Sequence, residues 1–359
     1  MITAKFGGTA ITPSNLHFVK SCLTPNHNVV VVSAVGKEHP DDCKATDLLR
    51  NYYLSRDERF WTAFCGKYRR LTECNSVELD VDRLLFDARL RADKFDLAYC
   101  MSLGEELSAK IVAKYLSATY VEAEQTVRFG KRKLLLKDTL TAAASAFKGV
   151  ELAVTGGFYG GSINSRKLFS RGGSDITGSL CAVATCASLY ENWTDSYGVC
   201  VANPVKVFDV STVCSLSYDE MFALAKAGAE VLHPDAVKPC KTYGIPIKIG
   251  NFYNPAGAST LVSNCRSAAP VLSIAERTDS YGNTVTTVLH NVEQYVIASV
   301  LSDFLHGITQ VKQAFGKPYV TAQISVLSFS CSGNVVEIVT TKPIISPLYK
   351  LLKQSNLIQ

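Results

Sequence analysis

The sequence predicts an α/β fold in which a mainly parallel sheet is sandwiched by helices. Apolar runs of strand length alternate with stretches of helical periodicity through residues 1–265, as in sheets that carry helices on both faces. The run Val29–Val32 is continuously β-branched, which indicates a strand buried on both faces. Glycine-rich or polar loops follow four of the apolar strands. We therefore expect a ligand site at the edge of the sheet where these strands end.

The expected elements of this first region follow from the same patterns. Apolar residues recur at helical spacing across 57–114, and Gly130 in the middle of 127–136 indicates a β-hairpin. Strands are expected at 2–6, 28–33, 118–123, 152–155, 189–193 and 245–249. Helices are expected at 13–22, 57–114, 138–147, 176–189 and 217–227.

A change of composition near residues 264–270 predicts a second, smaller domain. Strands are expected beyond it at 284–290, 309–314, 321–329 and 334–340, with helices at 292–305 and 348–354. The sequence thus predicts a larger domain over 1–265 and a separate α+β domain over 270–359.

The composition argues against several classes of function. A net charge of +5 over 359 residues, with no basic run longer than that in 130–133, argues against nucleic acid as a partner. No apolar run approaches the roughly 20 residues that span a bilayer, and the chain starts in a strand rather than a signal peptide. The 12 cysteines form no Cys-x-x-Cys pairs, so we expect free thiols and no metal site of the protein's own. A cytoplasmic protein without a membrane partner is predicted.

The stretch 170–175, Ser-Arg-Gly-Gly-Ser-Asp, carries the strongest candidate site. It follows a glycine-rich run and leads into an apolar segment, which predicts a loop that becomes the N-terminus of a helix. Backbone amides at such an N-terminus attract an anion, and the planar guanidinium of Arg171 fits a carboxylate or a phosphate. Asp175 either caps the helix or orders a lysine, an amide or a metal ion.

Other candidate residues lie in loops that follow the predicted strands. Lys5 precedes Gly7 and Gly8, an arrangement that suits a phosphate but also occurs in ordinary turns. Thr46 is a candidate ligand or a plain helix cap, and Glu105 with its neighbour Glu106 is also consistent with a solvated pair. Several such loops in register favour a nucleotide together with an anionic second substrate.

Motifs spread along residues 1–265 resemble those of the aspartate kinases, which have the amino-acid-kinase fold. They are Lys5–Thr9, Ser33–Lys37, Thr46–Leu49, Gly104–Ala109, Gly157–Gly160, Phe169–Thr177, Trp193–Asp195, Val231–Pro234 and Ile245–Ile247. The resemblance implies transfer of the γ-phosphoryl group of ATP to the side-chain carboxylate of L-aspartate. The product is 4-phospho-L-aspartate, the entry to lysine, threonine and methionine synthesis.

The same resemblance implies roles for individual residues, with ATP and Mg²⁺ as cofactors. The catalytic pair would be Lys5 and Asp175, with Asp175 ordering the lysine. The nucleotide would be held by Lys5, Phe6, Gly7, Gly8, Thr194 and Asp195. The aspartate would be held by Thr46, Glu105, Arg171, Gly172, Gly173 and Ser174, with Glu105 at its amine and Arg171 at its α-carboxylate.

The C-terminal region resembles an ACT-type regulatory module in its strand and helix pattern. Such modules pair between subunits, which implies a homodimer or a higher homo-oligomer. They also imply a feedback amino acid, either lysine or threonine.

Some residues depart from the family pattern near the nucleotide. Asn203 stands where the family commonly has an acidic residue, and Val205 stands where it commonly has an arginine. The neighbouring Lys206 is a candidate to supply the positive charge of that arginine. Glu230 stands where the family often has a lysine. These changes leave open a non-catalytic relative that binds amino acids. A kinase of the same fold acting on glutamate is the other alternative.

Overall fold

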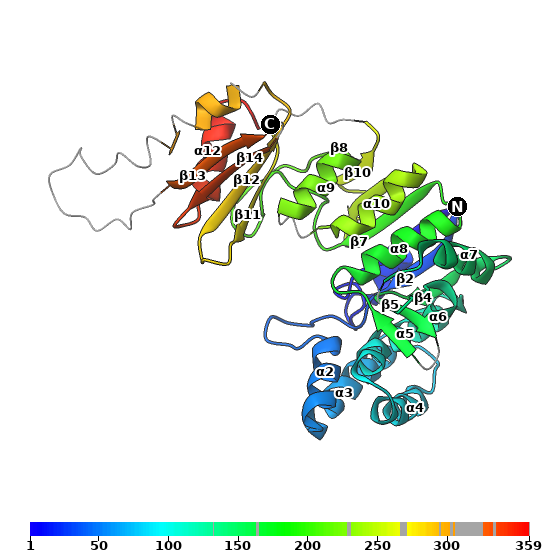
Figure 1. Cartoon of the computed structure of the whole chain (residues 1–359). Coiled ribbons are helices and arrows are strands. Elements are labelled where there is room, and N and C mark those ends of the chain that lie inside the picture. The colour runs from blue at the N-terminus through cyan, green and yellow to red at the C-terminus, as the bar shows by residue number, and fades with distance from the viewer. Residues whose placement is uncertain are drawn as a thin grey trace. The chain divides into compact units, whose positions relative to one another are not determined.

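The protein is represented by a computed structural model, drawn in Figure 1. The structure describes residues 1–131, 133–162, 165–227, 231–265, 271–293, 296–301, 304–305, 326–332 and 335–358. The chain divides into two compact units. Unit 1 comprises Met1–Ser196 and Asp235–Gly257, and unit 2 comprises Tyr197–Pro234 and Ala258–Gln359.

Unit 1 is built on parallel strands that lie in the order β3-β4-β2-β1-β7-β9. Their bounds are β1 Ile2–Phe6, β2 His27–Val32, β3 Thr119–Tyr120, β4 Ala153–Gly156, β7 Leu189–Thr194 and β9 Ile247–Asn251. Each predicted strand of this region is present, although the one expected at 118–123 is cut short because helix α6 (Ala123–Thr126) begins inside it.

Helices cover both faces of this sheet, as predicted. Alternate residues of a strand point to opposite faces, so Val30 and Val32 join the core formed with α5, whereas Val29 and Val31 join the core formed with α7 and α8. The helices of unit 1 are α1 Leu16–Cys22, α2 Ala45–Ser55, α3 Glu58–Cys74, α4 Val81–Lys94, α5 Leu97–Tyr115, α6, α7 Leu136–Phe147, α8 Gly173–Ala184 and most of α10 Pro234–Tyr243.

The helical stretch predicted at 57–114 consists of α3, α4 and α5. Each of the three begins at an aspartate whose side chain accepts a hydrogen bond from a backbone N–H of the first turn, which satisfies a donor that has no partner within the helix. These aspartates are Asp57, Asp80 and Asp96. The capping residues therefore divide one periodic stretch into three helices.

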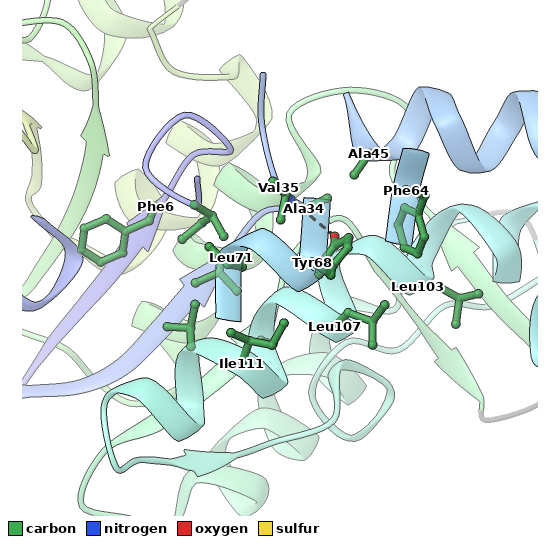
Figure 2. Packing of buried hydrophobic residues seen from close by; sticks show 14 of the residues in the cluster. Phe6, Ala34, Val35, Ala45, Phe64, Tyr68, Leu71, Leu103, Leu107 and Ile111 are labelled. Atoms are coloured by element: carbon green, nitrogen blue, oxygen red, sulfur yellow. Dashed lines mark hydrogen bonds between the residues drawn. The ribbon is translucent and has the colours of Figure 1, made fainter. Parts of the chain in front are cut away.

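Tyr68 of α3 connects this helix by hydrogen bonds to α5 and to the loop after β2. Its buried hydroxyl donates to the carbonyl oxygen of Gly104 at 2.7 Å and accepts from the N–H of Val35 at 3.5 Å. Figure 2 shows the ring between Val35 and Leu107, with the bond to Val35 as a dashed line. A single phenol group thus connects three segments that lead to the sheet edge.

We expect Tyr68→Phe to lower the free energy of unfolding by about 1 kcal/mol, the net worth of one buried hydrogen bond. Urea denaturation measures this change. Tyr53→Phe is the matched control, because no hydrogen bond of its hydroxyl is present in the described structure. Equal stability of the two variants would contradict the role given to the Tyr68 hydroxyl.

The glycine-rich run at 156–161 was expected to be a loop, and this expectation is wrong for part of it. Strand β5 (Tyr159–Ser162) pairs antiparallel with β6 (Ser165–Leu168). A Cβ atom on Gly160 would lie 2.5 Å from the side chain of Val127, so the glycine is needed where a second segment packs closely. The hairpin expected around Gly130 is reduced to a turn with one bridge between Phe129 and Leu134.

Unit 2 contains an antiparallel sheet in the order β11-β12-β14-β13, together with a parallel pair formed by β8 and β10. The bounds are β8 Ser215–Ser217, α9 Tyr218–Ala227, β10 Ser259–Ser263, β11 Val271–Thr278, β12 Thr284–His290, β13 Val326–Ser332, β14 Val335–Thr340 and α12 Ile345–Gln354. The antiparallel sheet with its helices confirms an α+β arrangement for the C-terminal part.

Several predictions for this part concern residues that the structure does not describe. The strands expected at 284–290 and 334–340 are confirmed as β12 and β14, whereas β10 and β11 were missed. The strand expected at 309–314 lies outside the described residues, as do parts of those expected at 321–329 and 292–305. The boundary predicted between 265 and 270 also lies at undescribed residues and stays a prediction.

Glu276 of β11 organises the start of α12. Its carboxylate accepts hydrogen bonds from the N–H groups of Ile344 and Ile345, both at 2.8 Å, and from the hydroxyl of Thr286. A carboxylate at a helix N-terminus is stabilised by the helix dipole. The ammonium group of Lys206 lies 3.2 Å from the second oxygen of the same carboxylate. Lys206, predicted as a substitute cation near the nucleotide, is therefore engaged within unit 2.

Candidate active site

The loops that follow β1, β2 and β4 meet at one edge of the sheet of unit 1. The last residues of these strands are level with one another, because Phe6 pairs with Val32 and Val32 with Gly156. The backbones of the loops after β1 and β2 are in direct contact: the N–H of Gly36 donates to the carbonyl of Gly8 at 3.0 Å. A Cβ atom on Gly36 would lie 2.4 Å from that carbonyl oxygen, so only glycine fits.

Lys5 and Asp175 form an ion pair at this edge, with Nζ 2.7 Å from Oδ1. Lys5 is on β1 and Asp175 is in the first turn of α8, so the pair brings together two residues that the sequence analysis had assigned to one site. The ammonium group lies over Gly7, since a Cβ atom there would be 3.7 Å from Nζ. A fixed cation therefore stands beside the glycine turn.

Helix α8 begins directly at the sheet edge. Gly172 precedes it with a φ of 61°, a left-handed conformation that favours glycine. The hydroxyl of Ser33 donates to that of Ser174 at 2.9 Å, and a Cβ atom on Gly157 would lie 2.6 Å from Cα of Ser174. The N-terminus of α8 is thus locked against the loops after β2 and β4, with its positive end at the candidate site.

Glu105 is a buried carboxyl group whose Oε2 atom has no hydrogen-bond partner among the residues that the structure describes. Burial raises the pKa of Glu105 to about 8, although hydrogen bonds from backbone N–H groups, including that of Ala34, act in the opposite direction. The suggestion that Glu105 and Glu106 are a solvated pair is therefore wrong, because both side chains are buried. Glu105 contacts the loop after β2 through the N–H of Ala34, and Glu106 pairs with Arg91 of α4 and Arg166 of β6. A buried carboxyl with one oxygen left over suits a cationic ligand.

The remaining predicted residues lie at or near the same edge. Thr194 ends β7, and its hydroxyl donates to the carboxylate of Asp195 at 3.2 Å. Thr46 is half-buried in the first turn of α2. Lys44 occupies the N-cap position of this helix, so Thr46 is not the cap that the sequence left open. Arg171 is exposed, and no ion pair of its guanidinium is present in the described structure.

Ser33 lies at the candidate site, and its contact there was not revealed by the sequence alone. It was recognised only as part of a small-residue loop, and its hydrogen bond to Ser174 joins residues 141 positions apart. Gly156 and Gly157 could be recognised from the sequence as site candidates, because glycines at the end of a strand allow another segment or a ligand to approach the backbone closely. Glu230, the remaining departure from the family pattern, lies outside the described residues.

No group of three or more His, Cys, Asp or Glu side chains in the described part of the chain is arranged to hold a metal ion. Within the same part of the chain, no helix combines the length and the apolar character needed to cross a bilayer.

Comparisons with known proteins agree with this geometry. Residues 1–251 match the amino acid kinase family. Aspartokinase 3 of Bacillus subtilis (strain 168) is 31% identical over 322 residues, with 82% of this chain and 70% of that protein covered. Lysine-sensitive aspartokinase 3 of Escherichia coli (strain K12) is 26% identical over 299 residues, with 74% of this chain and 64% of that protein covered.

A comparison with a solved structure supports the same family. The crystal structure of the aspartate kinase of Clostridium acetobutylicum superposes with a TM-score of 0.71 at 25% identity, with 99% of this chain and 82% of that chain covered. The predicted fold class is thereby confirmed. The chain belongs to the amino acid kinase family, and within it to the aspartokinases, which phosphorylate the side-chain carboxylate of aspartate with ATP.

Proposed function

We propose that this chain transfers the γ-phosphoryl group of ATP to the side-chain carboxylate of L-aspartate and forms 4-phospho-L-aspartate. The observation that carries the proposal is the Lys5–Asp175 pair, 2.7 Å apart beside the glycine turn after β1. The buried carboxyl of Glu105 lies on the helix that packs against the same sheet edge and provides a place for an amino group.

The reaction needs charge neutralisation more than it needs a base. The side chain of free aspartate has a pKa of about 3.9 and is already ionised at neutral pH. The difficulty is to bring this anion to the phosphate, which is itself anionic. Lys5, the amides of Gly7 and Gly8 and the N-terminus of α8 would stabilise the charge on the transferring group, as in other phosphoryl transfers. Asp175 would hold the ammonium of Lys5 in place.

The two charged groups on the α-carbon of the substrate would be held by side chains of opposite charge. Glu105 would bind the α-ammonium, and Arg171 would bind the α-carboxylate through two parallel hydrogen bonds. Thr46, Ser174 and the amides of Gly172 and Gly173 would complete the aspartate pocket. Phe6, Thr194 and Asp195 would border the nucleotide.

Mg²⁺ fits this arrangement as a companion of the nucleotide. Mg²⁺ is commonly held by one or two carboxylates together with the phosphates of the substrate, so it does not need a cluster of protein ligands. Asp175 is the carboxylate at the site that would contribute. The ion would neutralise part of the phosphate charge.

Aspartate binding at pH 7 is expected to release about one proton from Glu105, because a group with a pKa of about 8 is mostly protonated at that pH. An ammonium placed beside the carboxyl favours its ionised form. Calorimetry in buffers of different ionisation enthalpy measures the released proton, and Glu105→Gln should abolish the release. A binding enthalpy that does not depend on the buffer would contradict this role.

The same pKa predicts how stability depends on pH without the ligand. The folded protein holds the Glu105 proton up to a pH of about 8, whereas the unfolded chain releases it near 4.5. Stability from this group is therefore fully present below pH 4.5 and is lost as the pH rises through 8. Glu105→Gln should flatten this dependence in denaturation curves.

One assay tests the proposed function. The purified protein is incubated with ATP, Mg²⁺ and hydroxylamine, which traps an acyl phosphate as a coloured hydroxamate, and with either aspartate or glutamate. Product with aspartate and little with glutamate supports the proposal. Product mainly with glutamate indicates a kinase for another carboxylate. No product with either, in a folded protein, indicates a non-catalytic relative.

We also propose that residues 270–359 form an ACT-like regulatory domain that responds to lysine or threonine and joins subunits into a homodimer or a higher homo-oligomer. The antiparallel sheet of unit 2 and the lysine-sensitive relative support this. Activity measured with lysine, threonine and both together, with light scattering for subunit number, tests it. A monomer whose activity ignores both amino acids would refute it.

A further inference from the structure

Lys67 of α3 is a buried cation that has no part in the reaction described above. Its side chain is 2% exposed, and its ammonium group pairs with the carboxylate of Asp42 in the loop after β2. Burying a charged group costs free energy unless the group is paired and hydrogen-bonded. Apolar residues often replace buried ion pairs without loss of stability, so packing alone does not account for a lysine at this position.

The second contact of Lys67 is with the backbone of Gly36. The ammonium group donates a hydrogen bond to the carbonyl oxygen of Gly36 at 3.0 Å. On the other side of the same residue, the N–H of Gly36 donates to the carbonyl of Gly8, also at 3.0 Å. The two peptide groups that flank the Cα atom of Gly36 are therefore both held, one by α3 and the other by the loop after β1.

Gly36 needs this support because it is a glycine. The close contact with Gly8 excludes every other residue, since a Cβ atom on Gly36 would lie 2.4 Å from the carbonyl oxygen of Gly8. Glycine also gives the backbone more conformational freedom than any other residue. The hydrogen bond from Lys67 restricts this freedom, because it fixes the peptide group that follows Gly36.

Gly8 is packed directly against the same part of the loop after β2. A Cβ atom on Gly8 would lie 2.9 Å from the carbonyl oxygen of Ala34 and 3.2 Å from the Cα atom of Gly36. The two backbones thus leave no room for a side chain between them, and a displaced Gly36 would displace Gly8 as well. A continuous chain of contacts leads from Lys67 through Gly36 to Gly8, whose amide would meet the transferring phosphate.

Asp42 keeps the ammonium group of Lys67 in place. Its Oδ2 atom accepts a hydrogen bond from the N–H of Glu38 at 2.9 Å, and its Oδ1 atom accepts one from the N–H of Cys43 at 2.7 Å. Burial acts to raise the pKa of Asp42, but the hydrogen bonds from Lys67 and from these backbone groups more than offset it and lower that pKa. The carboxylate is therefore ionised at neutral pH and remains the partner of the lysine.

We propose that Lys67 is a positioning residue, which holds the amide of Gly8 in place for the transferring phosphate by fixing the backbone of Gly36. The inference rests on the proposed function. A hydrogen-bond donor that is already in place stabilises the transition state without a cost of rearrangement, and a small displacement of such a group lowers the rate. Lys67 acts through the two glycines rather than on the substrates.

The test compares Lys67→Met with Arg70→Met in the hydroxamate assay. Arg70 lies three residues further along α3 and pairs with Glu38 at 2.5 Å, so each variant removes a cation that ties the loop after β2 to this helix. Only Lys67 contacts the backbone of Gly36. For Lys67→Met we expect kcat to fall about tenfold and the KM for ATP to rise about threefold. The KM for aspartate should stay within about twofold, because the charged groups proposed to hold it lie on other segments. Arg70→Met should leave all three constants within about twofold.

Hydrogen exchange shows whether the effect passes through the loop. In Lys67→Met the amide of Gly36 should exchange with solvent about tenfold faster than in the unaltered protein, whereas Arg70→Met should leave its rate unchanged. A fall in kcat without faster exchange at Gly36 would overturn the inference, since the effect would then reach the site by another route.

A purely stabilising role predicts a different result. Lys67→Met would then lower the melting temperature, but the folded protein would keep its kcat and its KM for ATP, which overturns the inference. Should Lys67→Met fail to fold, the double variant Lys67→Met/Asp42→Asn decides, because it leaves neither charge of the pair buried without its partner. A tenfold fall in the kcat of the double variant supports the inference, and an unchanged kcat refutes it.

Failure of the proposed function would be seen separately. In that case the unaltered protein forms no hydroxamate from aspartate, whatever the variants do, and the inference falls with it. An active protein whose folded Lys67→Met variant keeps its kcat refutes only the inference.

Discussion

Lys5→Ala is expected to lower kcat by about 10²- to 10³-fold, which corresponds to a loss of about 3–4 kcal/mol of transition-state stabilisation. The ammonium lies beside the glycine turn and is held by Asp175 at 2.7 Å, so it is in place before the phosphate arrives. A preorganised charge of this kind stabilises the transition state without a cost of rearrangement at the moment of reaction. Steady-state hydroxamate assays at saturating ATP and aspartate measure the effect.

The control for this prediction is Lys20→Ala, which removes an exposed lysine in the last turn of α1. It should retain full activity. Circular dichroism and a melting curve establish that Lys5→Ala is folded, since Lys5 is nearly buried and its loss leaves the carboxylate of Asp175 without this cation. A folded Lys5→Ala protein with near-normal kcat would refute the assignment of Lys5 to the transferring phosphate.

Arg171→Lys is expected to raise the KM for aspartate about tenfold or more, which corresponds to about 1.4 kcal/mol or more of binding free energy. A guanidinium binds a carboxylate through two parallel hydrogen bonds, and the ammonium of lysine cannot reproduce that geometry. The KM for ATP should change little. Stability should not change, because Arg171 is exposed.

Initial rates over a grid of aspartate and ATP concentrations separate the two Michaelis constants. Arg83→Lys, an exposed arginine on α4, is the matched control and should leave both constants unchanged. If the KM for ATP rises and that for aspartate does not, then Arg171 faces the nucleotide and the proposed placement of the substrates is wrong.

The sheet of unit 1 was predictable because its signals are local. The β-branched run Val29–Val32 is visible without any knowledge of its neighbours, and glycines after strands mark where a backbone must pass close to another group. The Lys5–Asp175 pair followed from the loops and the family resemblance together, since strands that end level bring their loops to one edge.

The environment of the charged residues was not predictable, because it depends on contacts between distant segments. Nothing in the immediate surroundings of Glu105 and Glu106 indicates burial. For Glu105 it involves the loop after β2, and for Glu106 it involves α4 and a hairpin about 60 residues later. That hairpin was itself missed, because glycines are poor strand formers and the run was taken for a loop. Arg166 therefore carried no signal: an arginine beside a glycine-rich run gives no indication of the carboxylates that surround it.

The direct backbone contact between Gly8 and Gly36 has a consequence for motion. The N–H of Ser33 also donates to the carbonyl of Phe6 at 3.2 Å, so the loops after β1 and β2 share their hydrogen bonds and can open only together. We expect the amide of Gly36 to exchange with solvent as slowly as the strands that it joins, because its opening requires the loss of both loops. The two loops proposed to hold the phosphate would then form a rigid part of the site, and the exposed turn that carries Arg171 is a candidate for closure over the substrates.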